Sequence, residues 1–381
     1  MAGITAMSDL RQLELVLFFT DGVSLETWER QGMLQREIAL YRALRPHLKG
    51  ITFVTYGTRN DLDYGEHLDG IRILCNRWHL SRRWYLRTFP LMLRSLRTGP
   101  VLFKSNQING AESPLYLAQR FAKPCIVRCG YLPSDHLQWR HGRQHPVTQQ
   151  ALSREKHLFT QAHTCVVAAP HMKIFLQQEY GVPGDNIRIH PNYVDTTRFA
   201  PNPEIPKAKR RLLFIGRLEQ EKNPFALVEA CQGLDCELWI VGDGHERQSL
   251  ETLARERQVR TRFLGIRPHN ELPDLFNSAT AFVLPSHWEG HPKTLLEALS
   301  CGLPCIGSAI PSIMGVITHG HNGLLCDLTP PAIQQAILQV LDQPALQEHL
   351  GHNARQYALE HLRLERIVEQ ELDLYRKWVH A

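Results

Sequence analysis

The sequence predicts an α/β protein made of two doubly wound domains, and three observations support this fold class. The chain has 381 residues, which is more than one hydrophobic core usually organises and suits two domains. Short apolar runs alternate with longer segments of helical spacing, as in parallel sheets covered by helices. The stretch APNPEIPKAKRR, which begins at residue 200, has the proline and charge content of a linker.

The first half supplies six predicted strands. They are residues 12–19, 51–56, 71–75, 101–104, 124–128 and 165–168. A turn with Gly22 follows the first strand, and apolar spacing predicts one helix over 28–47. Gly22 would let the backbone approach a ligand closely, although a plain tight turn fits this stretch equally well. The first apolar run contains Glu14 and lacks a cleavage site of small residues, which favours a strand over a signal peptide and predicts a cytoplasmic protein.

The second half repeats this alternation. Apolar runs predict strands at 211–215, 237–241, 263–265, 281–284 and 304–307. Helices are expected to begin at Pro224 and to cover 272–278, 292–301, 331–341 and 362–379. Pro292 suits a first helical position and Gly302 suits the residue just past a helix end.

Composition narrows the function classes. Nine cysteines show no zinc pattern, so we expect reduced, buried thiols. Asp61 and Asp63 form the one D-x-D motif and lie in a polar stretch, where we expect a solvated loop and no metal. The net charge of +5 divides unevenly, because residues 1–200 carry 25 Lys and Arg against 16 Asp and Glu. A basic first half suggests an anionic partner on that side.

Residues 71–100 carry seven arginines and no acid, interleaved with aromatic residues such as Trp78 and Trp84. This composition fits a surface helix on an anionic bilayer. Two other interpretations remain open: a solvated face whose aromatic side chains pack inward, and a nucleic-acid patch. We favour the membrane surface and predict no nucleic acid as a partner.

Two carboxylates and two cations stand beside predicted strand-to-helix turns. Glu289 ends a loop that follows a strand, and Glu297 lies in the next helix, whose N-terminus can stabilise a phosphate. Arg217 and Lys222 belong to one loop of the second domain, where both could reach a diphosphate. For the acids or the cations taken separately, solvated surface charges would be the more common explanation.

The surrounding motifs favour a functional site over solvated surface charges. E-G-x-P-x-x-x-x-E followed by A-L-x-C-G-L-P from Glu289, and G-R-L-x-x-x-K from Gly216, closely resemble the donor-binding signatures of retaining glycosyltransferases of family four, also called glycosyl transferases group 1. The stretch PNYVDTTRF from Pro191 is similar to the crossover segment of that family. The resemblance implies the GT-B fold, in which two Rossmann-like doubly wound domains face each other across a cleft.

The resemblance also implies a domain plan and a donor site. Residues 1–200 would form the acceptor-binding domain, 201–365 the nucleotide-sugar donor-binding domain, and 366–381 a terminal helix that crosses back to the first domain. Glu289, Arg217 and Lys222 would be catalytic, and Glu297 would accept the ribose hydroxyls. The implied donor-binding residues are Gly22, Gly216, Arg217, Lys222, Gly242, Gly244, Ile266, Arg267, Glu289, Gly290, His291, Pro292, Lys293, Thr294, Leu295 and Glu297.

The acceptor side is less defined. Strand ends of the first domain carry Asn106, Gln107, Arg128 and Tyr131, and α/β sheets bind ligands at such positions. Many relatives keep a histidine at the end of a late strand of this domain. The sequence here is VRCGY, in which Arg128 is the candidate to take part of that role.

The expected reaction is hexosyl transfer from a UDP- or GDP-sugar to a glycan or lipid-linked acceptor, with retention by a front-face route. Two cations, the Gly22 turn and a helix N-terminus would neutralise the departing diphosphate, so no metal or other cofactor is required. The family context suggests polysaccharide or lipopolysaccharide biosynthesis at the inner face of the cell membrane. The alternatives are a GT-B phosphorylase and a non-catalytic nucleotide-sugar-binding protein.

Overall fold

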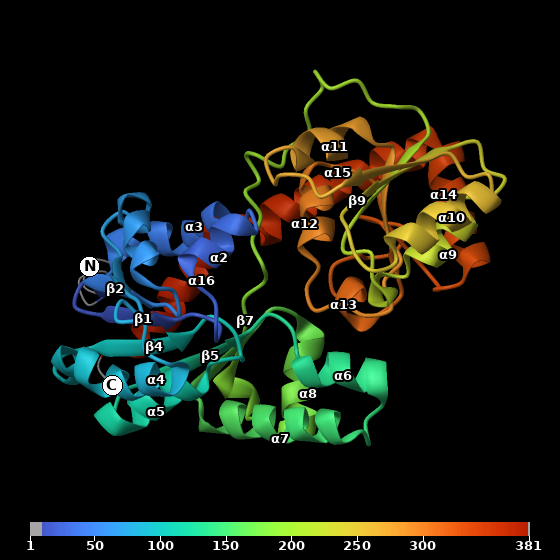
Figure 1. The fold of residues 1–381 in the computed structure, drawn as a ribbon. Helices are drawn as coiled ribbons and strands as arrows, with labels where there is room; N and C mark the ends of the chain where they lie inside the picture. The colour runs from blue at the N-terminus through green and yellow to red at the C-terminus, as the bar shows by residue number, and fades with distance from the viewer. Residues whose placement is uncertain (1–9, 380–381) are drawn as a thin grey trace. The chain divides into compact units, whose positions relative to one another are not determined.

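The computed structural model describes residues 10–379 and divides into two compact units (Figure 1). The first unit contains the chain up to His190 together with the residues from Glu365 onward, and the second unit is Pro191–Leu364. The chain therefore leaves the first unit once and returns to it with its last helix. The crossing at Pro191 precedes the proline-rich stretch that marks the boundary predicted near residue 200.

The first unit is built on a parallel sheet of seven strands in the order β3-β2-β1-β4-β5-β6-β7. Its strands are β1 Glu14–Phe18, β2 Gly50–Val54, β3 Arg72–Leu74, β4 Val101–Ser105, β5 Cys125–Cys129, β6 Thr164–Val167 and β7 Ile187–Ile189. Its α-helices are α2 Leu25–Arg30, α3 Leu34–Leu44, α4 Arg82–Met92, α5 Glu112–Phe121, α6 Pro133–His141, α7 Pro146–Gln161, α8 Pro170–Tyr180 and α16 Leu364–Arg376. Its 3-10 helices are η1 Arg45–His47, η2 Arg59–Leu68, η3 Arg94–Arg97 and η4 Gly184–Asn186.

The second unit has a parallel sheet of six strands in the order β10-β9-β8-β11-β12-β13. Its strands are β8 Arg211–Ile215, β9 Glu237–Val241, β10 Thr261–Gly265, β11 Ala281–Leu284, β12 Cys305–Ser308 and β13 Leu324–Cys326. Its helices are η5 Gln220–Lys222, α9 Pro224–Ala230, α10 Arg247–Glu256, α11 Leu272–Ser278, α12 Lys293–Ser300, α13 Pro311–Met314, α14 Pro330–Asp342 and α15 Pro344–His361. Each sheet has its own hydrophobic core.

Both sheets have a point at which the strand order reverses. In the first unit it lies between β1 and β4, and in the second unit it lies between β8 and β11. Open α/β sheets bind ligands beyond the carboxyl ends of the two strands at such a point. The topology alone therefore indicates that the loops after these four strands are the candidate ligand-binding loops.

Two local predictions are wrong. The single helix expected over 28–47 is divided into α2, α3 and η1, because Gly32 adopts a left-handed backbone with φ of +65° that no continuous helix contains. Asp61 is buried, at 1% exposure, where a solvated loop was expected. Its carboxylate accepts hydrogen bonds from the Thr55 hydroxyl and the Glu26 amide, so it fastens η2 to the start of α2.

All nine cysteines are free thiols, and eight of them are buried. Burial raises the pKa of several of these thiols, including Cys165, whose pKa rises to about 12. This agrees with the expected reduced thiols. No helix within residues 10–379 combines the length and apolar character needed to cross a bilayer.

A buried ionic cluster anchors the last helix to the first unit. Lys104 of β4 and Glu371 of α16 are 0% and 1% exposed, and Lys104 Nζ lies 2.5 Å from Glu371 Oε2. His190 Nδ1 lies 3.1 Å from the other carboxylate oxygen, and Lys104 donates to the Tyr375 hydroxyl. Burial alone would raise the pKa of Glu371, but the charge of Lys104 and the contact with His190 hold that pKa well below its usual range.

We predict that Glu371→Gln destabilises the first unit by about 3–5 kcal/mol, because it leaves the Lys104 charge buried without its counter-ion. Urea-dependent hydrogen exchange of the β4 amides measures this free energy. Glu369→Gln, at an exposed position of the same helix, is the matched control and should change it by less than about 0.5 kcal/mol. Equal protection of β4 in the two variants would contradict the anchoring role.

Candidate functional site

An ion pair joins the two loops at the strand reversal of the second unit. Lys222, in the loop after β8, places its Nζ 2.6 Å from Oε1 of Glu289, in the loop after β11. The Ser286 hydroxyl donates to the same carboxylate oxygen at 2.8 Å. Glu289 is 7% exposed, whereas the Lys222 side chain keeps 17% of its surface accessible. The sequence predicted both residues, and the structure shows that they contact each other.

Glu221 joins the same two loops through a further hydrogen bond and also holds Arg217 within its own loop. Its backbone carbonyl accepts the His287 amide at 2.8 Å, and its carboxylate accepts from Arg217 Nη2 at 2.8 Å. Glu221 is buried, at 7% exposure. The Arg217 side chain is 69% exposed, so it remains accessible to a ligand.

Glu297 faces inward from α12 and contacts a histidine that sequence reasoning missed. His269 Nε2 lies 2.9 Å from Glu297 Oε1, and the histidine ring lies 5.0 Å from the Phe199 ring. Glu297 is 3% exposed. The only signal for His269 in the sequence is its position four residues after the strand end at Gly265, and a lone loop histidine carries no specific meaning. His269 fixes one oxygen of Glu297.

Two glycines, Gly242 and Gly244, let the loops after β8 and β9 touch. A Cβ on Gly242, whose φ is +128°, would lie 1.9 Å from the Gly216 carbonyl oxygen. A Cβ on Gly244 would lie 2.4 Å from the Leu218 carbonyl oxygen. The backbone N–H of Leu218 also donates to the Asp243 carbonyl at 2.9 Å. These close approaches explain the glycines and hold the Arg217 loop in place.

The start of α12 differs slightly from its prediction. The helix is Lys293–Ser300, and Pro292 is its N-cap, whereas Pro292 was expected to be the first helical residue. No side chain caps this helix end. The preceding His291 is held by Asn192, whose amide N–H donates to His291 Nδ1 at 3.2 Å and whose side chain donates to the His291 carbonyl at 3.0 Å. Gly290, Thr294 and Leu295 belong to the same turn.

Ile266 and Arg267 follow the end of β10. The Ile266 side chain is 78% exposed, which is unusual for an apolar residue of this size. Arg267 Nε donates to the Leu264 carbonyl at 3.1 Å, so the arginine folds back onto its own loop. Their expected contact with a nucleotide base stays a prediction.

The candidate residues of the first unit lie at the ends of β4 and β5, and β4 is one of the two strands at its own strand reversal. The Asn106 amide donates to the Phe18 carbonyl at the end of β1, and the Asn106 carbonyl accepts from Arg128 Nη1 at 3.3 Å. The Gln107 side chain accepts the Gly130 amide at 2.8 Å, and Tyr131 is 40% exposed. The structure therefore brings Asn106, Gln107 and Arg128 together.

Gly22 lies in the turn after β1. It has φ of +77°, so it needs the left-handed conformation that glycine adopts most readily. The turn is closed by the Val23 amide, which donates to the Thr20 carbonyl at 2.9 Å. In the part of the chain that the structure describes, no group of three or more His, Cys, Asp or Glu side chains is arranged to hold a metal ion.

Comparisons with known proteins find a family match within the second unit. Residues 195–357 match the family Glycosyl transferases group 1. They belong to that family. The motifs that begin at Gly216 and Glu289 lie inside the matched segment, which confirms the resemblance seen in the sequence.

Curated relatives of this glycosyl transferases group 1 segment cover about half of the chain. One is N-acetyl-alpha-D-glucosaminyl L-malate synthase of Bacillus anthracis, 29% identical over 55% of this chain and 58% of the relative. Another is the UDP-Gal:alpha-D-GlcNAc-diphosphoundecaprenol alpha-1,3-galactosyltransferase of Escherichia coli, 30% identical over 50% of this chain and 54% of the relative. The chain thus matches little more than half the length of these relatives.

Solved structures share the fold of nearly the whole chain. Sucrose-phosphate synthase from Thermosynechococcus elongatus superposes with a TM-score of 0.76 at 22% identity, over 96% of this chain and 98% of that one. HepE of Anabaena, in complex with UDP and glucose, gives a TM-score of 0.74 at 15% identity, over 94% and 98%. Together with the two parallel sheets, these likenesses confirm the predicted GT-B fold with two Rossmann-like domains.

We predict that Gly242→Ala lowers the free energy of unfolding of the second unit by about 3 kcal/mol or more, because its methyl group would collide with the backbone of Gly216. Hydrogen exchange of the β8 amides measures the loss. Gly233→Ala is a suitable control, since Gly233 also has a positive φ, +75°, but nothing lies within 4 Å of its Cβ position. That control should cost about 1–2 kcal/mol. A similar cost at both positions would show that the close approach is unimportant.

Proposed function

We propose that this protein is a glycosyltransferase that moves a hexose from a nucleoside-diphosphate sugar to a glycan or lipid-linked acceptor. The observation that carries the proposal is the contact of Lys222 with Glu289 at the strand reversal of the second unit, within the family's own motifs. One of the relatives named above is a galactosyltransferase by name, and the HepE complex with UDP favours a UDP-sugar as the first donor to test.

Lys222 supplies the charge that the leaving group needs. When the bond between the anomeric carbon and the diphosphate oxygen breaks, negative charge grows on the diphosphate. The Lys222 ammonium group and the accessible Arg217 guanidinium can both stabilise that charge. Because these side chains are cationic, we propose that no metal ion is required.

Glu289 is placed to act on the sugar. Its Oε1 accepts from both Ser286 and Lys222, which fixes the carboxylate beside the cation. A carboxylate in that position can accept hydroxyls of the donor sugar and stabilise positive charge on the ring. Glu297, held by His269, is proposed to accept the ribose hydroxyls.

The proposed stereochemical course is retention by a front-face route. The acceptor oxygen bonds to the anomeric carbon on the face from which the diphosphate departs, and the acceptor proton passes to the departing phosphate oxygen. This route needs no enzymic nucleophile on the opposite face. The side chains near the sugar then have to hold charge and exclude water, and do not form a covalent intermediate.

We predict that Lys222→Ala and Glu289→Gln each lower kcat by about 10²–10³-fold, the range typical of removing one preorganised charge-stabilising group. The donor is first selected with a thermal-shift panel of UDP- and GDP-sugars, and transfer or hydrolysis is then measured. Lys209→Ala and Glu256→Gln change the same residue types at exposed positions and should leave kcat within twofold.

Near-normal turnover in both site variants would overturn the assignment. Phosphate-dependent release of a sugar phosphate would favour a GT-B phosphorylase instead. Donor binding without transfer or hydrolysis for any member of the panel would favour a non-catalytic nucleotide-sugar-binding protein.

The basic segment of the first unit supports a second proposal, contact with an anionic membrane. On α4 and just before it, Trp84 and Trp78 are 58% and 49% exposed, while Tyr85 and Phe89 are buried. The aromatic residues are therefore divided between core and surface. Arg77 lies over the Trp78 ring and Arg87 over the Trp84 ring, at 4.4 and 4.9 Å from the ring centroids. Exposed indoles beside arginines suit the polar boundary of a bilayer.

We predict that Arg83→Gln with Arg87→Gln weakens co-sedimentation with phosphatidylglycerol vesicles by roughly 30-fold, at about 1 kcal/mol for each charge. Arg59→Gln with Arg120→Gln removes the same charge from exposed positions of the same unit and should have little effect. Binding to phosphatidylcholine vesicles that equals binding to phosphatidylglycerol would argue against an electrostatic membrane contact.

A further inference from the structure

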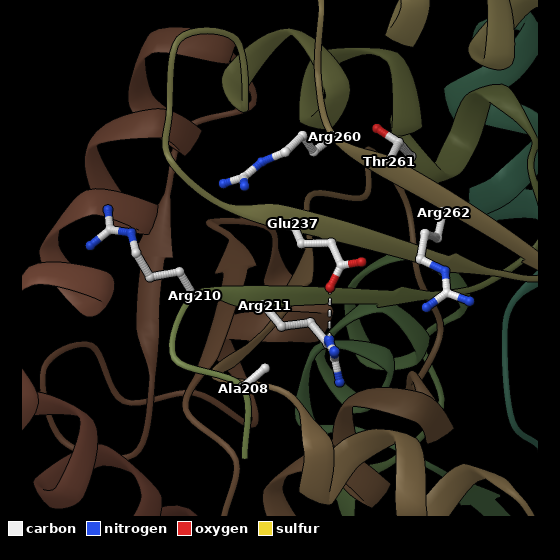
Figure 2. Close-up of a pocket in the computed structure, with 7 residues that line it drawn as sticks. All are labelled: Ala208, Arg210, Arg211, Glu237, Arg260, Thr261 and Arg262. Atoms are coloured by element: carbon white, nitrogen blue, oxygen red, sulfur yellow. Dashed lines mark hydrogen bonds and ion pairs between the residues drawn. The ribbon is translucent and has the colours of Figure 1, made fainter. Parts of the chain in front are cut away.

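A cavity of about 370 Å³ lies at the amino-terminal edge of the second unit's sheet, the edge opposite the candidate site (Figure 2). Its polar lining consists of Arg210, Arg211, Glu237, Arg260, Thr261 and Arg262. Four of these are arginines. We call this group the arginine pocket. It uses none of the residues of the glycosyltransferase motifs.

Sheet register explains why the arginine pocket forms. Arg211 of β8 pairs with Glu237 of β9, and Arg262 of β10 pairs with Trp239 of β9. Residues two apart on a strand share a face of the sheet, and so do register partners on neighbouring strands. The side chains of Arg211, Glu237, Trp239 and Arg262 therefore all point to one face. The half-exposed Glu237 and Trp239 show that this end of the face is only partly covered.

Two of the four guanidinium groups, those of Arg211 and Arg262, lie over the Trp239 ring. Arg211 is centred 3.6 Å from the Trp239 ring and Arg262 is centred 5.0 Å from it, and Arg211 Nε lies 3.2 Å from the Glu237 carboxylate. Figure 2 shows Glu237 between the arginines of the two neighbouring strands. Stacking on an aromatic ring limits the rotamers of an arginine, so less entropy is lost when it binds an anion.

The charge of the pocket is incompletely neutralised. Arg210 pairs with Asp342 at 2.8 Å, and Arg260 pairs with Asp235. Among residues 10–379, Arg262 forms no ion pair. The acids of the existing pairs are 33–81% exposed, and ion pairs of this kind contribute only about 0–1 kcal/mol each. A ligand with two or more negative charges can therefore compete for these guanidinium groups.

We infer that the arginine pocket binds a phosphate-bearing anion, a phosphomonoester or a diphosphate. The forked donors of arginine match phosphate oxygens in pairs, and several guanidinium groups favour an anion of multiple charge over a simple carboxylate. Gly216 follows Arg211 by five positions along β8, which is roughly 16 Å of extended chain. The ligand is thus distinct from the diphosphate of the proposed donor.

The test is calorimetric titration of inorganic pyrophosphate in the presence of saturating UDP, which occupies the proposed donor site. We expect the wild type to bind pyrophosphate under this condition, and Arg211→Gln with Arg262→Gln to weaken it at least tenfold. Arg255→Gln with Arg257→Gln removes the same charge from exposed positions around the end of α10 and should leave the affinity unchanged. Because Arg211 also packs on Trp239, Arg262→Lys is included as a milder change that keeps the charge and loses the fork.

The titration and a sedimentation experiment together distinguish a soluble phosphate ligand from a lipid headgroup and from no ligand. Equal affinity in wild type and both pocket variants, or no binding beside UDP, overturns a soluble phosphate ligand. The same proteins are then sedimented with phosphatidic acid vesicles, whose headgroup is a phosphomonoester, and binding lost only in the pocket variants assigns the phosphate to a lipid headgroup. No difference in either experiment removes the proposal altogether. Failure of the proposed transferase activity leaves this binding measurement unaffected.

Discussion

The ion pair between Lys222 and Glu289 is the interaction on which the candidate site depends. It connects the loops after β8 and β11, the two strands at which the order of the second sheet reverses. Ser286 supports the carboxylate, and the Ser308 hydroxyl in turn donates to the Ser286 carbonyl at 2.5 Å. The cation is therefore positioned before any donor arrives, and an incoming diphosphate has to compete with a carboxylate for it. Preorganisation of this kind is how a site stabilises charge without reorganising during the reaction.

A second lysine–glutamate pair in the same chain has a purely structural role. Lys104 and Glu371 are completely enclosed, have Tyr375 and His190 as additional partners, and fasten the last helix to the first unit. No ligand can reach that pair without unfolding. Lys222 keeps 17% of its side-chain surface accessible, which is the physical difference between a structural pair and one that can exchange partners.

The strands that the sequence predicted well are short, continuous apolar runs. Residues 211–215, 237–241 and 281–284 were predicted with the bounds that β8, β9 and β11 show. The three-residue strands β7 and β13 were missed, whereas β3, of the same length, was predicted at 71–75, because runs this short carry too little periodicity to be identified consistently. The helix expected over 28–47 failed at Gly32, since apolar spacing continues across a break that only the backbone conformation reveals.

The candidate site was likewise predicted only in part. Motif spacing identified Arg217, Lys222, Glu289 and Glu297, but it did not reveal that Lys222 contacts a residue 67 positions away or that Arg217 pairs with Glu221. Those contacts depend on which loops the sheet order brings together. His269 and the arginine pocket carried no motif, because a single histidine and scattered strand-start arginines gain meaning only from their neighbours in space. Buried Asp61 is the converse case, a residue whose polar surroundings in sequence concealed its burial.

The most direct test of the central claim is the affinity of UDP for wild type, Lys222→Ala, Glu289→Gln and the double variant. UDP carries the diphosphate but no sugar, so Glu289 should affect its binding only through Lys222. The account predicts that Glu289→Gln binds UDP more tightly than wild type, that Lys222→Ala binds it more weakly, and that the double variant resembles Lys222→Ala. Unchanged affinity in Lys222→Ala, or a gain from Glu289→Gln that persists without Lys222, would contradict it.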